Sequence, residues 1–321
     1  MKTARLQTAT RAAPDMHAPT VVTFGETLVD RFRDQSVLGG APFNVSCHLA
    51  GLGVRPVLLT RTGKDAEGAR LLEALSVRGI DTGGVQRDPI RPTGQVSVSE
   101  DNQGHVFDIL PDQAYDHIHA GIARMVGMAA HPDLVYFGTL SQRGDSRRAL
   151  RELLEVVTAH VFLDVNLRDP WVDTDALRWS LQRASTVKLN EAELDRVSAL
   201  FGLHAGTPRA RASLLIAEFG LERVVVTCGD AGAWTLDMAG RLFATEGGSV
   251  PQLIDTVGAG DAFAAVFMLG LLYAWPLPET LVRADRFARA VCGIRGAVPD
   301  SNAFYQPFRQ DWHLHREVAR A

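Results

Sequence analysis

The residues best suited to chemistry lie at positions 255–263, where two glycines and a carboxylate precede a long apolar run. Gly258 and Gly260 permit a tight backbone turn that a side chain would obstruct. Residues 262–275 are all apolar, glycine or tyrosine, which predicts a buried helix beginning at this turn. Unpaired N–H groups at the start of a helix attract anions. Asp261 at such a place suits a kinase, in which an anion is transferred and an aspartate removes a proton from the acceptor.

Phosphoryl transfer to a hydroxyl group needs a cradle for phosphate charge, a base, a metal environment and a dry pocket. The predicted cradle, which faces the charge on the γ-phosphoryl group, consists of the backbone amides of Gly258, Ala259, Gly260 and Asp261. Asp261 is the predicted base, a role that in general contributes about 10²- to 10⁴-fold to a rate. Taken alone, a Gly-x-Gly-Asp turn is more often only a capped helix with an acidic first turn, so the wider pattern has to decide.

Other nucleotide-binding motifs fail on spacing. No Gly-x-x-x-x-Gly-Lys-Ser/Thr loop matches, since Leu58 stands where the first glycine belongs and Asp65 where the serine or threonine belongs. In the glycine turn, Phe263 stands where a dinucleotide-binding fold needs a small residue. These mismatches argue against a P-loop enzyme and against a dehydrogenase.

Composition describes an ordinary globular protein. Of 321 residues, 46% are hydrophobic and 22% are charged, which excludes a disordered chain. The formal net charge is −4 without a basic run, which argues against a nucleic-acid partner. Cys47, Cys228 and Cys292 are few, distant and odd in number, so we expect a reducing compartment and no disulfide framework.

The chain ends and the apolar segments bear on location. Residues 1–19 lack hydrophobic periodicity and an apolar signal core, so we expect a disordered tail, with a weak transit peptide as the alternative. Residues 313–321 are predicted to form a second tail, which leaves residues 20–312 for the α/β domain. The apolar run at 262–275 is too short to span a bilayer. We therefore expect a cytoplasmic protein without a membrane partner.

Strand-like and helix-like segments alternate along the chain. Strands are predicted at residues 20–24, 56–60, 134–137, 161–165, 187–189 and 223–227. Helices are predicted at residues 41–52, 65–78, 146–159, 176–184, 208–219 and 262–275. The alternation predicts an α/β fold with a mostly parallel central sheet and helices on both faces.

Two segments interrupt this alternation. Residues 30–38 are short, polar and extended, and residues 94–110 have the alternation and glycine-containing turn of a hairpin. Together they predict a small β-sheet, a lid built from residues 30–40 and 92–112, which covers a cleft and excludes water. The alternative is a surface hairpin without a role in the reaction.

The pattern over about residues 20–303 resembles the ribokinase-like (PfkB-type) sugar kinases. Residues 255–263 resemble the C-terminal signature of that family, and residues 38–45 resemble its N-terminal signature. The resemblance implies the ribokinase-like fold with its β-sheet lid, ATP as the co-substrate and Mg²⁺. The Gly-Ala-Pro-x-Asn wording at residues 40–44 is closest to fructokinase-like members.

The resemblance also implies a sugar site. Asp30 would bind sugar hydroxyl groups, because a carboxylate accepts from two hydroxyls at once. Gly39 and Gly40 would let the backbone approach the sugar, and Asn44 would offer a donor and an acceptor. Without the family, Asp30 is equally well a turn residue at a strand end, and Asn44 a residue near a helix start.

On the nucleotide side, Arg168 follows a predicted strand at the edge where open α/β sheets bind ligands, and the resemblance supports it as a phosphate contact. Asp164 and Asn166 beside it equally suit anchoring of the loop. Asn190 and Glu193 resemble the Asn-x-x-Glu element of the family, which would organise Mg²⁺ through water. By spacing alone, an asparagine cap with an acidic first turn explains this pair better.

Thr227, Gly229 and Gly232 resemble the family's nucleotide-binding Thr-x-Gly-x-x-Gly turn, although a plain hairpin turn explains the same glycines. Asn302 is placed by the resemblance near the adenine pocket. In many relatives the residues matching Asp255 and Thr256 supply carbonyl ligands to a monovalent cation, so the resemblance makes K⁺ a candidate cofactor.

The sequence therefore predicts ATP-dependent phosphorylation of a sugar primary hydroxyl, with fructose as the leading acceptor. Another sugar or sugar acid, such as ribose or 2-keto-3-deoxygluconate, is the alternative within the same chemistry. A non-catalytic sugar-binding sensor of the same fold is the alternative of a different class, and the presence of Asp261, Gly258 and Gly260 argues against it. Relatives often dimerise through the lid, whose apolar strand edges would be exposed, so we expect a homodimer.

Overall fold

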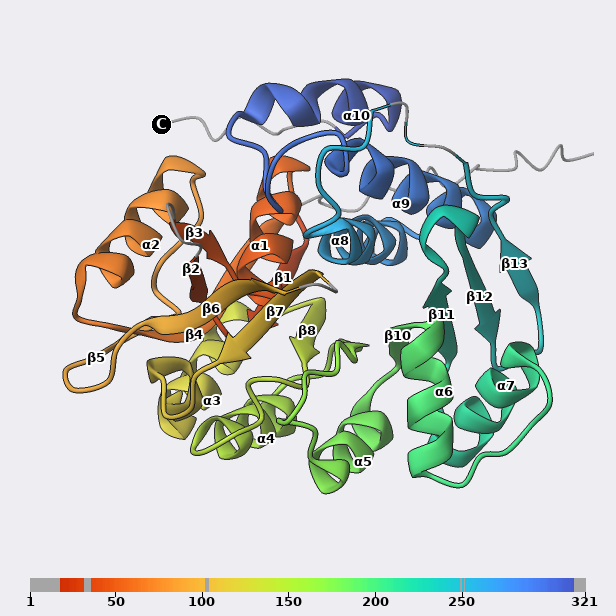
Figure 1. Ribbon diagram of the computed structural model, residues 1–321, viewed down its shortest axis with the longest axis horizontal. Helices are drawn as coiled ribbons and strands as arrows, with labels where there is room; N and C mark the ends of the chain where they lie inside the picture. The colour runs from red at the N-terminus through yellow and green to blue at the C-terminus, as the bar shows by residue number, and fades with distance from the viewer. Residues whose placement is uncertain (1–17, 32–35, 102–103, 249, 251, 315–321) are drawn as a thin grey trace, which may run out of the picture.

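The computed structural model describes residues 18–314 apart from residues 32–35, 102–103, 249 and 251 (Figure 1). The predicted tails at 1–19 and 313–321 lie almost wholly outside the described residues. Among the described residues, no helix combines the length and apolar character needed to cross a bilayer.

A nine-stranded sheet forms the centre of the molecule. In sheet order its strands are β13 (Leu242–Ala244), β12 (Ala233–Asp237), β11 (Arg223–Thr227), β10 (Thr186–Asn190), β9 (His160–Asp164), β8 (Leu134–Gly138), β1 (Thr20–Phe24), β4 (Arg55–Gly63) and β5 (Val85–Asp88). Neighbours from β11 through β5 are parallel, whereas β12 is antiparallel to both of its neighbours, β11 and β13. The predicted parallel sheet is confirmed, and all six predicted strands belong to it.

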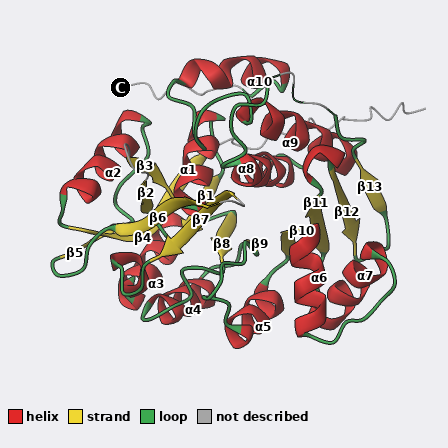
Figure 2. Cartoon of the chain, viewed as in Figure 1, coloured by secondary structure: helices red, strands yellow, loops and turns green. Residues whose placement is uncertain are grey.

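Helices cover both faces of this sheet (Figure 2). One face carries α1 (Ala41–Gly51), α2 (Ala66–Val77), α8 (Ala259–Leu272), α9 (Leu277–Val291) and α10 (Gln306–Asp311). The other face carries α3 (Ala120–Ala130), α4 (Ser146–Val156), α5 (Thr174–Arg183), α6 (Glu191–Leu200) and α7 (Pro208–Phe219). Successive residues of one strand, such as Val21 and Val22, enter opposite cores, which is why the parallel strands are apolar throughout.

Local chemistry explains several helix starts. Asp65 caps α2 by accepting from the backbone N–H of Gly68, and Thr207 caps α7 by accepting from that of Ala210. Helix α8 begins at Ala259, three residues before the predicted start, and its central turns are fully buried between α1 and α9. A helix that is apolar on all sides is stable in water only when it is enclosed in this way.

A second sheet of four strands is separate from the first. Its order is β3 (Ser36–Gly39), β2 (Leu28–Arg31), β6 (Gly94–Asp101) and β7 (Gly104–Ile109). The hairpin of β6 and β7 is antiparallel, and β2 joins β6 in parallel. An apolar cluster of Leu28, Val96, Ile109 and Leu140 lies beneath this small sheet. The predicted small β-sheet is therefore present, whereas its boundaries as a lid stay a prediction.

Candidate active site

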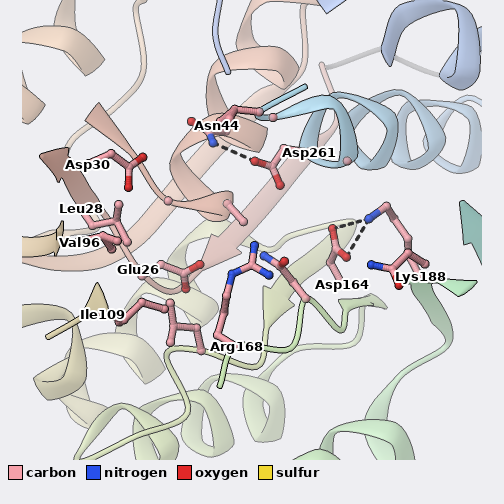
Figure 3. Close-up of a pocket in the computed structure, with 18 of the residues that line it drawn as sticks. Glu26, Leu28, Asp30, Asn44, Val96, Ile109, Asp164, Arg168, Lys188 and Asp261 are labelled. Atoms are coloured by element: carbon pink, nitrogen blue, oxygen red, sulfur yellow. Dashed lines mark hydrogen bonds and ion pairs between the residues drawn. The ribbon is translucent and has the colours of Figure 1, made fainter. Parts of the chain in front are cut away.

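A cleft of about 480 Å³ lies where the small sheet meets the carboxyl ends of the central strands (Figure 3). The sheet register brings the relevant strand ends together, since Asp164 pairs with Lys188 and Asn190 pairs with Thr227. All four of these residues line the cleft. In an open parallel sheet this edge is the usual place for a ligand.

Asp261, the third residue of α8, meets Asn44 of α1 at one wall of the cleft. The Nδ2 atom of Asn44 donates a hydrogen bond of 2.8 Å to Oδ2 of Asp261. Burial raises the pKa of Asp261 to about 6; the hydrogen bond from Asn44 and the charges of Lys188 and Arg168 oppose this rise, while Asp164 adds to it. Because the carboxyl group faces the cleft, it is placed and tuned to accept a proton near neutral pH.

The turn before Asp261 has the geometry of an anion site. Gly258 has a φ of +79°, and a Cβ atom there would lie 2.3 Å from Cβ of Ala297, so only glycine fits. The amide of Ala259 donates to the carbonyl oxygen of Thr256 at 3.3 Å. Within the described residues, the amides of Gly260 and Asp261 donate to no other group. These two N–H groups, at the positive end of the α8 dipole, are the part of the predicted cradle that is free for a ligand.

Asp30 of β2 projects from the small sheet into the same cleft. Burial raises the pKa of Asp30 to about 6, and the charge of Arg168 opposes the rise. A Cβ atom on Gly39 would lie 2.9 Å from Oδ2 of Asp30 and would press on that carboxyl group. Gly40 has a φ of +101°, and a Cβ atom there would lie 2.6 Å from the carbonyl oxygen of Glu26. Both glycines therefore keep the backbone close to the Asp30 side of the cleft.

A buried ion pair lies under the glycine turn. Nζ of Lys188 donates to both carboxylate oxygens of Asp164, at 2.9 and 3.0 Å. Burial acts to lower the pKa of Lys188, but the charge and the hydrogen bonds of Asp164, together with the charges of Glu193 and Asp261, outweigh it, and the pKa is raised. A Cβ atom on Gly260 would lie 3.5 Å from this ammonium group. The pair thus places a fixed positive charge beside the predicted cradle.

Asn190 and Glu193 form a capping box at the start of α6. Oδ1 of Asn190 accepts from the backbone N–H of Glu193 at 2.8 Å, and Oε2 of Glu193 accepts from that of Asn190 at 2.9 Å. Oε1 of Glu193 accepts from the N–H of Leu167 at 2.8 Å, next to Arg168. Both residues line the cleft. Each oxygen of Glu193 accepts one backbone N–H and keeps a second lone pair, with which it would hold a water molecule of Mg²⁺, an ion that dehydrates reluctantly.

The predicted nucleotide turn has the conformation of a hairpin. Strands β11 and β12 are antiparallel, and the N–H of Cys228 donates to the carbonyl oxygen of Gly232 at 2.8 Å. Thr227 lines the cleft. Gly229 is exposed and Gly232 is buried against Thr245, and neither belongs to the cleft lining.

Of three further predicted residues, one lines the cleft and two do not. Asp255 accepts from the N–H groups of Val257 and Gly296, each at 3.0 Å, and so fastens the loop before α8. Thr256, the next residue, lines the cleft, whereas Asp255 itself does not. Asn302 is exposed in a short 3₁₀ turn and does not line the cleft.

Most of the predicted site residues come together in this one cleft. Those that line it are Asp30, Gly40, Asn44, Arg168, Asn190, Glu193, Thr227, Thr256, Gly258, Gly260 and Asp261. Those that do not are Gly39, Ala259, Gly229, Gly232, Asp255 and Asn302. Glu26 and Lys188 also line the cleft and were missed by sequence analysis. For Lys188 the available signal was a charge within an otherwise apolar strand, whereas Glu26 lies in the link between β1 and β2 and carries no such signal.

The chain as a whole is similar to known carbohydrate kinases. The family model for pfkB family carbohydrate kinases matches residues 15–303. A fructokinase of Vibrio alginolyticus is 30% identical over 239 residues, which are 70% of this chain and 73% of that protein. A 5-dehydro-2-deoxygluconokinase of Geobacillus thermodenitrificans is 26% identical over 261 residues, which are 76% of this chain and 75% of that protein.

Solved structures show the same fold. A fructokinase of Vibrio cholerae, in a form with bound fructose, ADP and calcium ion, superposes with a TM-score of 0.72 at 24% identity, covering 90% of this chain and 98% of the other. A fructokinase of Xylella fastidiosa with bound ATP superposes with a TM-score of 0.76 at 21% identity, covering 92% of this chain and 99% of the other. The architecture of this chain is therefore ribokinase-like, as predicted.

Proposed function

Because the chain belongs to the pfkB family of carbohydrate kinases and is thus an ATP-dependent sugar kinase, we propose that it phosphorylates fructose on a primary hydroxyl group. The observation that supports this most directly is the pairing of Asp261 with Asn44 beside free amides at the start of α8. The proposed base and the proposed anion site then lie together on one wall of the cleft.

In the proposed reaction, Asp261 takes the proton from the primary hydroxyl as its oxygen attacks the γ-phosphorus in line. The amides of Gly260 and Asp261 stabilise the negative charge of the transferred group. The adenine nucleotide lies along the carboxyl ends of β9, β10 and β11, near Arg168, Asn190 and Thr227. Gly229, Gly232 and Asn302 are proposed to contact its outer parts.

Mg²⁺ fits this arrangement as a companion of ATP. The described residues hold no group of three or more His, Cys, Asp or Glu suited to a metal ion, so the ion would be held mainly by phosphates and water, with Glu193 reached through water. When bound, Mg²⁺ neutralises phosphate charge. We also propose Asp255 and Thr256 as the place where K⁺ would contact the chain through backbone carbonyls.

The sugar end of the cleft favours a neutral polyol. It presents two carboxyl groups, Asp30 and Glu26, together with an apolar wall of Leu28, Val96, Ile109 and Leu140. The carboxylate of a sugar acid would have to lie near these acids, where like charges repel. Arg168 is the cation that would favour a sugar acid, and for that reason 2-keto-3-deoxygluconate belongs in the test, with ribose as a second neutral sugar.

The test is a comparison of acceptors with ATP and Mg²⁺, measured as ADP release. We expect the highest kcat/KM for fructose, followed by ribose, with 2-keto-3-deoxygluconate lowest. A higher kcat/KM for the sugar acid would overturn the assignment of fructose. If calorimetry shows that fructose binds but ATP yields no ADP with any acceptor, the result would instead support a non-catalytic sugar-binding sensor.

We propose two properties of the whole molecule as well. The edge strands β3 and β7 of the small sheet have one neighbour each, which supports a homodimer formed through this sheet. Light scattering, with an expected mass of two chains, would test it.

Cys47, Cys228 and Cys292 are all unpaired, which supports the cytoplasm as the compartment.

A further inference from the structure

Glu26 is a buried acid at the cleft to which the proposed reaction assigns no role. It lies in residues 25–27, which join β1 of the large sheet to β2 of the small one. Its side chain is 3% exposed and lines the cleft together with Asp30 and Asp261. Figure 3 shows its carboxyl group pointing toward Arg168, across the cleft from the pair of Asn44 and Asp261.

The carboxyl group of Glu26 accepts backbone hydrogen bonds, but one of its two oxygens has no partner among the described residues. The backbone amides of Glu26 itself and of Ala41, the first residue of α1, lie close enough to lower its pKa. Oε2 of Glu26 has no hydrogen-bond partner among the described residues. A buried polar atom without a partner costs about 1–3 kcal/mol, so an unpaired oxygen at a cleft is a place where a ligand gains affinity.

A second unpaired atom flanks the same cleft. Oδ1 of Asn44 is also buried without a partner, while the Nδ2 atom of this residue is used by Asp261. The two orphan oxygens belong to residues on either side of the space next to the proposed base. A molecule with several hydroxyl groups would satisfy both.

The electrostatic surroundings suit a hydroxyl ligand. Burial raises the pKa of Glu26 to about 7; the nearby charge of Asp261 adds to the rise, whereas Arg168 and the two amides oppose it. A carboxyl group that is partly protonated at neutral pH both donates and accepts hydrogen bonds. A sugar hydroxyl does the same, whereas an anionic group would be repelled by the three acids around it.

We propose that the side chain of Glu26 binds a second hydroxyl group of the acceptor sugar and so positions the reacting hydroxyl against Asp261. This inference rests on the proposed sugar kinase function and deepens it, since it makes Glu26 a specificity-determining residue for neutral sugars. The competing explanation is structural, because Glu26 also serves the uncapped start of α1, where Gly40 has no side chain to offer.

The experiment compares Glu26→Ala and Glu26→Gln with the wild type, using fructose and the best acceptor of the sugar comparison. Gln keeps an oxygen for the amide of Ala41 and an amide group for the sugar, whereas Ala keeps neither. We expect Glu26→Ala to raise the sugar KM about 10- to 100-fold and the ATP KM by less than about threefold. Glu26→Gln is expected to raise the sugar KM less than Glu26→Ala does.

The matched control is Thr27→Val. Thr27 is the next residue, fully buried, and its hydroxyl group faces Thr60 and not the cleft. Its replacement disturbs the same linking segment without removing a cleft group, so the sugar KM should stay within about twofold of the wild type.

Deoxy analogues of the acceptor identify the bound hydroxyl. For one analogue, the loss of affinity seen with the wild type should vanish with Glu26→Ala, because the contact is already gone.

Lower thermal stability of the variants with unchanged sugar KM and unchanged calorimetric sugar affinity would overturn the inference and leave a purely structural role. If Glu26→Ala does not fold, the same comparison with Glu26→Gln decides. Failure of every acceptor to be phosphorylated would sink the proposed function, whereas an unchanged sugar KM in an active variant would sink only this inference.

Discussion

The Nδ2 atom of Asn44 and the Oδ2 atom of Asp261 lie 2.8 Å apart although 217 residues separate them in the chain. One belongs to α1, near the start of the chain, and the other to α8, near its end. The two signatures found in the sequence therefore meet at a single hydrogen bond, which orients the proposed base.

Replacing Asp261 with Asn tests the base directly. Asn keeps the shape and the partner of Asp261 but does not take a proton, so we expect kcat to fall about 10²- to 10⁴-fold with the sugar KM nearly unchanged. Sugar-dependent ADP release measures it. An unchanged kcat would rule Asp261 out as the base.

The pH dependence of kcat/KM follows from the raised pKa of Asp261. Because the base acts without its proton, activity should fall as the pH drops through about 6. The hydrogen bond from Asn44 lowers this pKa, so Asn44→Ala should move the acid limb of the profile to higher pH. An acid limb that stays in place in Asn44→Ala would contradict the coupling, whatever the effect of this variant on sugar affinity.

Gly258→Ala tests the shape of the anion site. The added Cβ atom would meet Ala297 at 2.3 Å in a left-handed turn, which should displace the amides and lower kcat about 10²-fold, the effect of losing one such donor. Gly202→Ala is the control, since Gly202 has a φ of +69° with no atom near its Cβ position. The control should cost stability of about 1 kcal/mol and leave kcat unchanged. Equal kcat losses in the two variants would refute a specific role of the turn.

We expect the removal of one partner of the Lys188–Asp164 ion pair to destabilise the protein more than the removal of both charges. Lys188→Met leaves the buried Asp164 carboxylate unpaired, which should lower the free energy of unfolding by about 3–5 kcal/mol. The double variant Lys188→Met/Asp164→Asn should lose less than Lys188→Met alone, because no buried charge remains. Urea unfolding of Lys188→Met, Asp164→Asn and the double variant measures these losses, and strictly additive losses would contradict the pairing.

Much of the fold is readable from local patterns. The central strands are continuous apolar runs such as Val224, Val225 and Val226, because both faces of a parallel sheet are buried. The short edge strand β13 was not predicted, since its exposed residues form no such run, and β12 beside it was missed although it is mostly buried. Helix α9 was also missed, although Leu281 and Ala284 in it recur at helical spacing.

Site residues could be predicted from the sequence only where they belong to a short local motif. Asp261 and Asn44 stand in compact motifs, so their positions follow from the local sequence. Lys188 reaches the cleft because β10 lies beside β9 with Lys188 opposite Asp164, and strand order in a sheet is not contained in either strand. Glu26 was missed for a similar reason, since its burial depends on α1 packing beside it.

The chain passes from the large sheet to the small one through residues 25–27, and Glu26 lies within that passage. If Glu26 binds the sugar as proposed, the sugar contacts the segment that links the two sheets and also Asp30 of β2, so it ties the small sheet to the large one at the cleft.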